Sequence, residues 1–329
     1  MSEGAGAASD ASGCGPSAPP IPFGSLVLGA WAFGGEHWGD DGSDAESIAA
    51  VHAAFEGGIR WIDTAPLYGN GHADEVLGRA LEELGARRHE VQIATKVGPR
   101  PAGAEGHPRS RLDRRRIRED LEGTLARLGV ERVALVQTHW PDEEGTPIAE
   151  TVAALEELVE EGKAGAWGVC NVNERGLHAV AARARPATLQ VPYSMLRRDL
   201  EHDGLGEAAR SLGVPLLAYE TLGRGLLTGK FRGLPRFPKS DMRARDPRFW
   251  GTRFFRTMQS VELLRQAATR LGAPTAALPV AWALAQPGVA AAIVGAKRPE
   301  QVRQWLEVRE LAGDARTLKL LEKIAGTFR

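Results

Sequence analysis

The feature that most constrains the fold is an alternation of two kinds of segment, which begins near residue 25 and repeats eight times. Short apolar runs rich in β-branched residues are separated by longer segments whose apolar residues recur at helical spacing. This pattern is typical of βαβ units, which form a parallel sheet covered by helices. The predicted strands are residues 26–30, 59–63, 91–97, 133–138, 165–169, 187–191, 214–219 and 290–294. The predicted helices are residues 45–57, 73–85, 114–128, 148–162, 174–184, 204–212, 260–286 and 299–310.

Eight such units predict an α/β protein of the (β/α)8 or TIM barrel type, because a closed barrel leaves no strand edge unpaired. A doubly wound open sheet is the alternative. A chain of 329 residues could hold two domains, but one barrel can reach this size. We therefore predict a single barrel domain over residues 21–329. Residues 1–20, rich in small residues and proline, are expected to form a flexible tail.

Composition and charge exclude several classes of protein. The chain is 43% hydrophobic and 25% charged, with a net charge of -1, which is ordinary for a globular protein and unlike a disordered or fibrous one. The sequence lacks an apolar run of about 18 residues, and its charge gives no reason to expect a nucleic-acid or membrane partner. Two cysteines, Cys14 and Cys170, and no signal-peptide pattern predict a cytoplasmic protein without a disulfide framework.

One predicted connection is unusually long. About 40 residues separate the strand that ends at Tyr219 from the helix that starts near Ser260, and loops of this length are uncommon. The connection contains GRGLLTGK (223–230) and the basic, aromatic stretch RARDPRFWGTRFF (243–255). It is expected to be either a lid or cofactor clamp, or a disordered insert.

Polar or ionisable residues mark the ends of six successive predicted strands. In a barrel these ends meet at one mouth, where active sites form, so we expect the side chains to converge there. The residues are Asp63 with Tyr68 in the following loop, Lys96, His139, Asn171, Gln190 and Tyr219.

Lys96 interrupts an apolar strand, and a buried ammonium needs a partner, which Asp63 could supply. A cation next to Tyr68 would lower the pKa of the phenol and make it a general acid near neutral pH. His139 could then donate to a carbonyl oxygen. The structural alternative is a buried ion pair, a packed tyrosine and a structural histidine. No spacing resembles a metal-ligand set or a nucleophile elbow.

A nucleotide would need an unusual site, because neither a GxGxxG nor a Walker pattern is present. The segment AAIVGAKRPEQV (291–302) could provide one. Gly295 allows close backbone approach, and Lys297 and Arg298 bring charge to the start of a predicted helix, where anions are attracted. An ordinary loop before a capped helix explains the segment equally well.

Taken together, these segments resemble the aldo-keto reductase family. The matches include LGAWAFGG (28–35), IDTAPLYGNG (62–71), IATKVG (93–98), QTHWPD (137–142), LQVPYS (189–194), LAYETLGRGLLTGKF (217–231) and AAIVGAKRPEQV (291–302), in the order of the family. The resemblance implies a (β/α)8 barrel that reduces carbonyl compounds with a nicotinamide cofactor, usually NADP(H), with NAD(H) as the other option. The substrate would be a small aldehyde or ketone, including sugar carbonyls.

The resemblance also assigns residues. It implies a catalytic set of Asp63, Tyr68, Lys96 and His139, in which Tyr68 protonates the carbonyl oxygen. The residues it implies for the cofactor are Asn171, Gln190, Tyr219, Leu222, Gly223, Arg224, Gly225, Lys230, Gly295, Lys297, Arg298 and Gln301. Asn171 and Gln190 would bind the nicotinamide carboxamide, and Tyr219 would stack on its ring. The aromatic residues expected to line the substrate pocket are Trp31, Trp38, Trp140, Phe249 and Trp250.

Some positions depart from the family pattern. The N-terminal β-hairpin that usually plugs the barrel floor is missing or shortened, Cys170 stands where serine is common, and Gln304–Trp305 replaces Glu-Asn.

Two rival functions stay open. One is a nucleotide-sensing binding subunit with a vestigial reductase site. The other is a sugar or polyol dehydrogenase that runs in the oxidative direction. The oligomeric state is not predicted.

Overall fold

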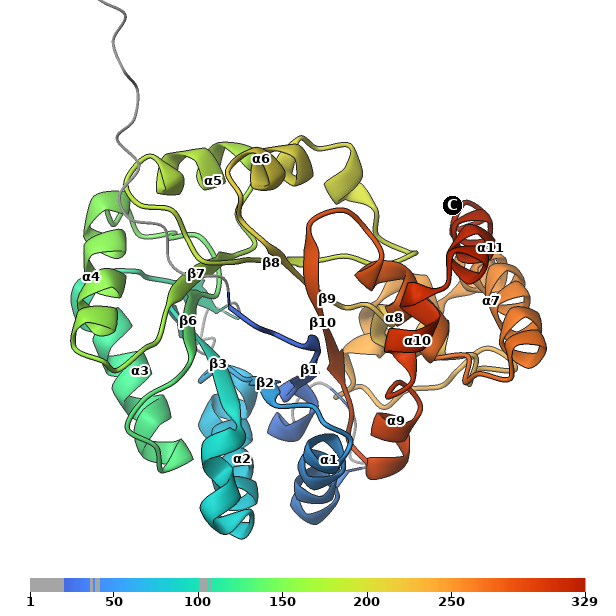
Figure 1. Cartoon of the computed structure of the whole chain (residues 1–329), viewed down its shortest axis with the longest axis horizontal. Coiled ribbons are helices and arrows are strands. Elements are labelled where there is room, and N and C mark those ends of the chain that lie inside the picture. Colours follow the sequence, from blue (N-terminus) through green and yellow to red (C-terminus); the bar gives the residue numbers. More distant parts are fainter. Residues whose placement is uncertain (1–20, 36–37, 39–41, 101–105, 107, 329) are drawn as a thin grey trace, which may run out of the picture.

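Eight parallel strands close into a barrel in the order β1, β10, β9, β8, β7, β6, β3, β2, which confirms the predicted (β/α)8 fold (Figure 1). The computed structural model describes residues 21–35, 38, 42–100, 106 and 108–328, so the expectation for residues 1–20 lies outside it. The barrel strands are β1 (Ser25–Gly29), β2 (Trp61–Asp63), β3 (Gln92–Val97), β6 (Leu135–Thr138), β7 (Trp167–Cys170), β8 (Leu189–Pro192), β9 (Leu216–Tyr219) and β10 (Val289–Gly295). A short antiparallel pair, β4 (Pro99–Arg100) and β5 (Arg109–Ser110), lies outside the barrel.

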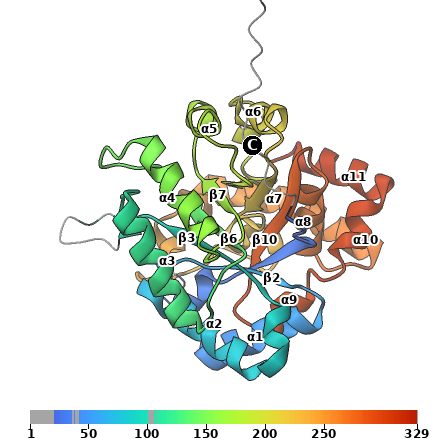
Figure 2. The same ribbon diagram turned by 60° about the vertical axis from the view of Figure 1, so that its left-hand side comes forward.

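The first six helices lie close to their predicted positions and surround the strands (Figures 1 and 2). Side chains cap the starts of three of them: Ser43 and Glu46 form a capping box, and Asp113 and Asn173 accept backbone N–H groups. The helices are α1 (Asp44–Glu56), α2 (His72–Glu83), α3 (Arg114–Leu128), α4 (Ile148–Glu160), α5 (Glu174–Ala181) and α6 (Leu205–Ser211).

The predicted helix 260–286 is wrong in extent, because two helices occupy this region. α7 (Gly251–Leu271) begins nine residues earlier than predicted and ends at Gly272, which adopts φ 65°. Pro274 follows, and the next helix is α8 (Ala277–Leu284). A left-handed glycine followed by proline stops a helix, and this signal overrides the apolar periodicity on both sides.

The C-terminal helices also differ from the prediction. The segment 299–310 divides into α9 (Pro299–Arg303) and α10 (Val308–Gly313). α11 (Ala315–Ala325) was not predicted, although Asp314 caps its first turn by accepting from Arg316 and Thr317. An aspartate before an amphipathic run was the available signal.

The connection after β9 is shorter than predicted, because α7 starts at Gly251. It spans residues 220–250 and holds three 3₁₀ helices, η5 (Gly223–Thr228), η6 (Met242–Arg245) and η7 (Pro247–Phe249). Leu226, Phe249 and Phe254 form a buried apolar cluster that fixes it to α7. The alternative of a disordered insert is therefore wrong.

The inward side chains of the strands form two layers of different character. Residues two apart on a strand share a face, so each strand contributes to both layers. The lower layer is apolar and includes Trp61, Ala94 and Leu135. Two residues further along the same strands lie Asp63, Lys96 and Gln137, all buried. Polar chemistry is thus confined to the carboxyl-terminal end of the barrel, where active sites of this fold form.

An aromatic pair packs at the floor of the barrel. Residues 21–24, which precede β1, form no strand. Phe23 packs on Trp61 with ring centroids 4.5 Å apart, and Trp61 Nε1 donates to the Pro22 carbonyl oxygen at 2.9 Å. Phe23 belongs to the same apolar cluster as the lower layer. The segment before β1 therefore packs against the end opposite the polar layer, where it lines a pocket of about 560 Å³.

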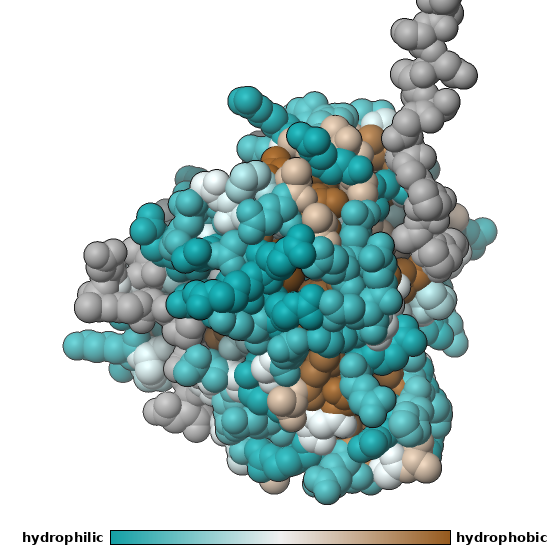
Figure 3. Space-filling model, turned by 90° about the vertical axis from the view of Figure 1, so that its left-hand side faces the viewer, coloured by the Kyte–Doolittle hydropathy of each residue, from teal (hydrophilic) through white to brown (hydrophobic). Residues whose placement is uncertain are grey.

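The outer surface around α3 and α4 is mostly hydrophilic, with smaller apolar patches between the polar groups (Figure 3). Ion pairs join the helices there, for example Arg118 Nη1 with Glu161 at 2.7 Å and Lys163 with Glu122 at 2.6 Å. Among the residues that the structure describes, none of the helices combines the length and the apolar character needed to cross a bilayer.

We expect Phe23→Ala to lower the free energy of unfolding by about 3–5 kcal/mol, because it removes a buried ring from the floor cluster. Phe255→Ala is the matched control, since Phe255 is 56% exposed, and it should cost less than about 1 kcal/mol. Denaturant unfolding of both variants checks this. A cost for Phe23→Ala no larger than that of the control would show that Phe23 does not stabilise the floor.

Candidate active site

Lys96 is the centre of the polar layer, and its ammonium has three acceptors. Nζ donates to Asp63 Oδ1 at 2.6 Å, to the Thr64 carbonyl oxygen at 3.0 Å and to Tyr68 Oη at 3.1 Å. The three N–H protons of an ammonium are all used in this way. Burial alone would lower the pKa of Lys96, but the charge of Asp63 outweighs it and the pKa is raised. Lys96 is therefore a fixed cation.

Asp63 is held from a second side. Its Oδ2 accepts from Gln190 Nε2 at 2.9 Å, and Gln190 Oε1 accepts from Cys170 Sγ at 3.3 Å. Burial raises the pKa of the Cys170 thiol, so it stays protonated and remains a donor. The amide of Gln190, expected at a cofactor carboxamide, is thus engaged in orienting the carboxylate of Asp63.

Two glycines place the Tyr68 loop against the loop after β1. Tyr68 starts η2 (Tyr68–Gly71), and Gly34 ends η1 (Trp31–Gly34). A Cβ added at Gly34 would lie 2.6 Å from the Gly69 nitrogen, and Gly69 itself adopts φ 60°. Only glycine allows both the backbone contact and this conformation. The motifs LGAWAFGG and LYGNG therefore pack directly against each other.

The phenol of Tyr68 holds its proton more tightly than expected. Burial raises the pKa of Tyr68 to about 12, and the positive charge of Lys96 offsets this only in part. The expectation that Lys96 gives the phenol a lowered pKa is therefore wrong for the protein without ligands, because desolvation is the larger effect. Since Tyr68 Oη accepts from Lys96, its own proton points away from the lysine and is available to another acceptor.

His139 lies across from Tyr68 with ring centroids 5.7 Å apart and planes at 83°. Its backbone N–H donates to the Val97 carbonyl oxygen at 2.9 Å, which fixes the end of β6 next to β3. Burial, followed by the charge of Lys96, lowers the pKa of His139 well below its usual range. The imidazole is therefore neutral at pH 7. Its Nδ1 is buried without a hydrogen-bond partner among the described residues.

Asn171 and Tyr219 connect the next strand ends to His139. Asn171 Nδ2 donates to the His139 carbonyl oxygen at 3.0 Å, and Tyr219 Oη donates to Asn171 Oδ1 at 2.9 Å. Asn171 adopts φ 58°, a strained conformation that occurs often at functional sites. The structure thus brings two predicted cofactor residues next to the predicted catalytic group.

Three of the five predicted pocket aromatics lie at this end of the site: Trp31 packs against Tyr68, Trp140 against His139, and Trp38 against Trp31. Trp31 lies 5.1 Å from Trp38 and 6.2 Å from Tyr68, and His139 lies 5.0 Å from Trp140, measured between ring centroids. The other two lie elsewhere. Phe249 belongs to the buried cluster on α7, whereas Trp250 is 53% exposed.

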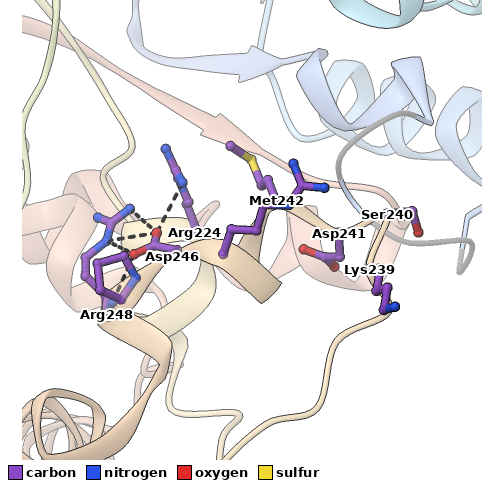
Figure 4. A pocket seen from close by; sticks show the side chains of 9 residues that line it. Arg224, Lys239, Ser240, Asp241, Met242, Asp246 and Arg248 are labelled. Carbon is purple, nitrogen blue, oxygen red and sulfur yellow. Dashed lines mark hydrogen bonds and ion pairs between the residues drawn. The ribbon is translucent and has the colours of Figure 1, made fainter. Parts of the chain in front are cut away.

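A cavity of about 610 Å³ lies within the connection after β9 (Figure 4). Of the residues predicted in this loop, which are Leu222, Gly223, Arg224, Gly225 and Lys230, Arg224 lines the cavity. Its Nη1 donates to Asp246 Oδ2 at 3.1 Å, beside Arg248. Lys239, Arg245 and Arg248 also line it, and none of the three was predicted individually. The basic composition of residues 243–255 was the signal for the two arginines, whereas Lys239 lies before that stretch.

The predicted residues after β10 form a compact turn at the start of α9. Gln301 Oε1 accepts from the backbone N–H of Lys297 at 2.6 Å and of Arg298 at 3.2 Å. Lys297 Nζ donates to the Trp38 carbonyl oxygen at 2.9 Å, and Arg298 Nε donates to Glu46 at 2.8 Å. Gly295 ends β10 directly before them. The turn therefore carries two cations next to the loop that contains Trp38.

The arrangement can donate one proton next to a fixed positive charge. A phenol that holds its proton, an ammonium that contacts its oxygen and a neutral imidazole adjoin one another, and the indole rings of Trp31 and Trp140 pack beside them. An oxygen that gains negative charge between Tyr68 and His139 would be stabilised by such donors.

Comparisons with known proteins agree on one family. The profile of the Aldo/keto reductase family matches residues 25–325. The aldo-keto reductase YhdN of Bacillus subtilis is 38% identical over 289 residues, which cover 86% of this chain and 84% of that protein. An Escherichia coli protein named NADH-specific methylglyoxal reductase is 32% identical and is covered to 89%, with 86% of this chain. The structure of a glycerol dehydrogenase from Gluconobacter oxydans superposes with a TM-score of 0.80 at 36% identity, over 91% of this chain and 90% of that one.

The native protein should resist ionisation of its tyrosines. Burial raises the pKa of Tyr68, Tyr193 and Tyr219, which are the three tyrosines of the chain. At about pH 10 free tyrosines are half ionised, so the unfolded chain loses these protons first and stability falls as the pH rises further. Tyrosinate absorbance of the folded protein at about pH 10 should be far below that of the denatured protein. A tyrosine that ionises below about pH 9 and disappears in Tyr68→Phe would contradict this.

Proposed function

The chain belongs to the aldo/keto reductase family, and on that premise we propose that it reduces the carbonyl group of small aldehydes or ketones with NADP(H). The observation that carries the proposal is the contact of Lys96 Nζ with Tyr68 Oη at 3.1 Å, with Asp63 bound to the same ammonium. This set provides a proton donor with a cation positioned to stabilise the phenolate that remains after transfer.

The residues at the mouth fit a nicotinamide dinucleotide. Within the described part of the chain His139 Nδ1 is buried without a hydrogen-bond partner, and Asn171, whose backbone adopts φ 58°, donates to the His139 carbonyl oxygen. Asn171 and Tyr219 would hold the nicotinamide end, and Lys297 and Arg298 the phosphate-bearing end. Arg224 and the cavity beside it are suited to the anionic link between the two ends. When bound, such a cofactor supplies the hydride that reduces the carbonyl carbon.

The protein groups then act on the oxygen. Tyr68 donates its proton to the carbonyl oxygen as charge develops there, and Lys96 stabilises the resulting phenolate through its N–H. His139, neutral at pH 7, donates an N–H to the same oxygen and orients it. Asp63 keeps the ammonium in place through its hydrogen bond to Lys96 Nζ. In the oxidative direction the same groups work in reverse, so a sugar or polyol dehydrogenase uses the same site.

The substrate class follows from the aromatic surroundings of the site. Trp31, Trp38 and Trp140 suit apolar aldehydes, and indole rings also stack on sugar faces. Phe249 and Trp250 stay predictions as residues that line the substrate pocket. The names of two relatives, a methylglyoxal reductase and a glycerol dehydrogenase, favour small polar carbonyl compounds and polyols as the first substrates to test. Because the methylglyoxal reductase is named as NADH-specific, NADH should be tested beside NADPH.

Tyr68→Phe should reduce kcat by about 10²–10⁴-fold, because the general acid is lost while the ring remains. Binding of NADPH, measured by quenching of tryptophan fluorescence, should be unchanged. The assay follows consumption of NADPH and of NADH with a panel of aldehydes, ketones and sugars, and includes the reverse reaction with polyols. Turnover by Tyr68→Phe close to that of the wild type would reject the mechanism. Tight cofactor binding without turnover on any substrate would favour the binding-subunit alternative.

A further inference from the structure

A buried carboxylate outside the predicted set is connected to the site through one residue. Asp74 lies on α2 and is fully buried. Its Oδ1 accepts from Thr64 Oγ1 at 2.7 Å, and its Oδ2 accepts from Thr124 Oγ1 at 3.1 Å. Arg127 on α3 donates to Oδ2 through Nε at 3.1 Å and Nη2 at 2.9 Å. Burial of the Asp74 carboxylate costs desolvation free energy, even with these donors. An apolar contact between α2 and α3 would avoid that cost.

Thr64 links this carboxylate to Lys96. Its backbone N–H donates to the Ala94 carbonyl oxygen at 2.9 Å, its hydroxyl donates to Asp74, and its carbonyl oxygen accepts from Lys96 Nζ at 3.0 Å. The residue directly follows Asp63, the counter-ion of Lys96. The position of the Thr64 carbonyl is thus fixed on one side by β3 and on the other by Asp74.

We propose that Asp74 is a positioning residue for the reduction, which orients the Lys96 ammonium toward Tyr68 by holding Thr64. An ammonium rotates freely about its last bond unless all its N–H groups have fixed acceptors. Asp63 and the Thr64 carbonyl determine two of the three directions, so the third is directed at Tyr68 Oη. Loosening the Thr64 carbonyl leaves the contact with Tyr68 less well aligned. The inference rests on the proposed function, because it explains how the Lys96 ammonium of that site is aligned with Tyr68.

The structural alternative is that Asp74 only fastens α2 to α3 through Arg127. Asp74→Asn cannot separate the two, because it leaves the charge of Arg127 without its partner and can destabilise the fold. Two threonines provide a matched pair instead. Thr64 and Thr124 are both fully buried and both donate to Asp74, but of the two only Thr64 contacts Lys96. Valine keeps the shape of threonine and removes the hydroxyl.

The experiment compares Thr64→Val with Thr124→Val in the full-length protein. Both variants should have a lowered melting temperature, because Thr64→Val removes one buried hydrogen bond and Thr124→Val removes two, Thr124 Oγ1 also accepting from Arg127 Nη2 at 3.1 Å. Thr64→Val should lower kcat by about fivefold to tenfold, as expected for one lost hydrogen bond, with an unchanged KM for the cofactor. It should also increase the solvent deuterium isotope effect on kcat, since proton transfer from Tyr68 becomes slower. Thr124→Val should leave kcat and the isotope effect unchanged.

A second measurement does not depend on turnover. Lys96 is the buried lysine of the described residues, so its side-chain ¹⁵N signal is recognised by slow exchange with water. Thr64→Val should shift this signal and speed its exchange, whereas Thr124→Val should not. Equal effects of the two variants on kcat and on the lysine signal would overturn the inference. A protein without turnover whose lysine signal responds only to Thr64→Val would contradict the proposed function. The linkage of Asp74 to Lys96 through Thr64 would still hold.

Discussion

The ion pair between Lys96 and Asp63 is the interaction on which the site depends. Both side chains are almost fully buried, and their charged atoms are 2.6 Å apart. A buried pair of this kind contributes little net stability, because desolvation of two ions offsets their attraction. It is tolerated here because the remaining donors and acceptors are satisfied by Thr64, Tyr68 and Gln190. The purpose that fits this arrangement is chemical: it keeps a cation in contact with the phenol of Tyr68.

Inward-facing residues of a strand recur every two positions, and they place the reacting groups and the apolar residues that support the barrel in separate layers. Trp61 and Asp63 point inward from the same strand, and so do Ala94 and Lys96, with the apolar member of each pair toward the floor. The apolar lower layer and Phe23 therefore support the fold without contact with the reacting groups.

Much of the fold could be predicted from the sequence, because strand and helix periods are local signals. The eight barrel strands and the contact of Lys96 with Asp63 followed from apolar periodicity and the cost of an unpaired charge. The break at Gly272 was missed because its flanks share the same apolar character. The direction of the Tyr68 pKa shift could not be predicted, since it depends on how much desolvation outweighs the nearby charge. The link from Asp74 to Lys96 joins residues on separate elements and leaves no local pattern.

The most direct test of the account replaces both members of the ion pair. In Asp63→Asn/Lys96→Met the charges are removed together, and the asparagine still offers Gln190 an acceptor. We expect an unfolding free energy within about 1–2 kcal/mol of the wild type, because a buried pair is replaced and not broken. We also expect turnover to fall by at least about 10²-fold, because the phenol loses the cation that stabilises its charge. A double variant that keeps its turnover would contradict this account, and one that also loses about 3–5 kcal/mol of stability would show that the pair serves the fold and not the reaction.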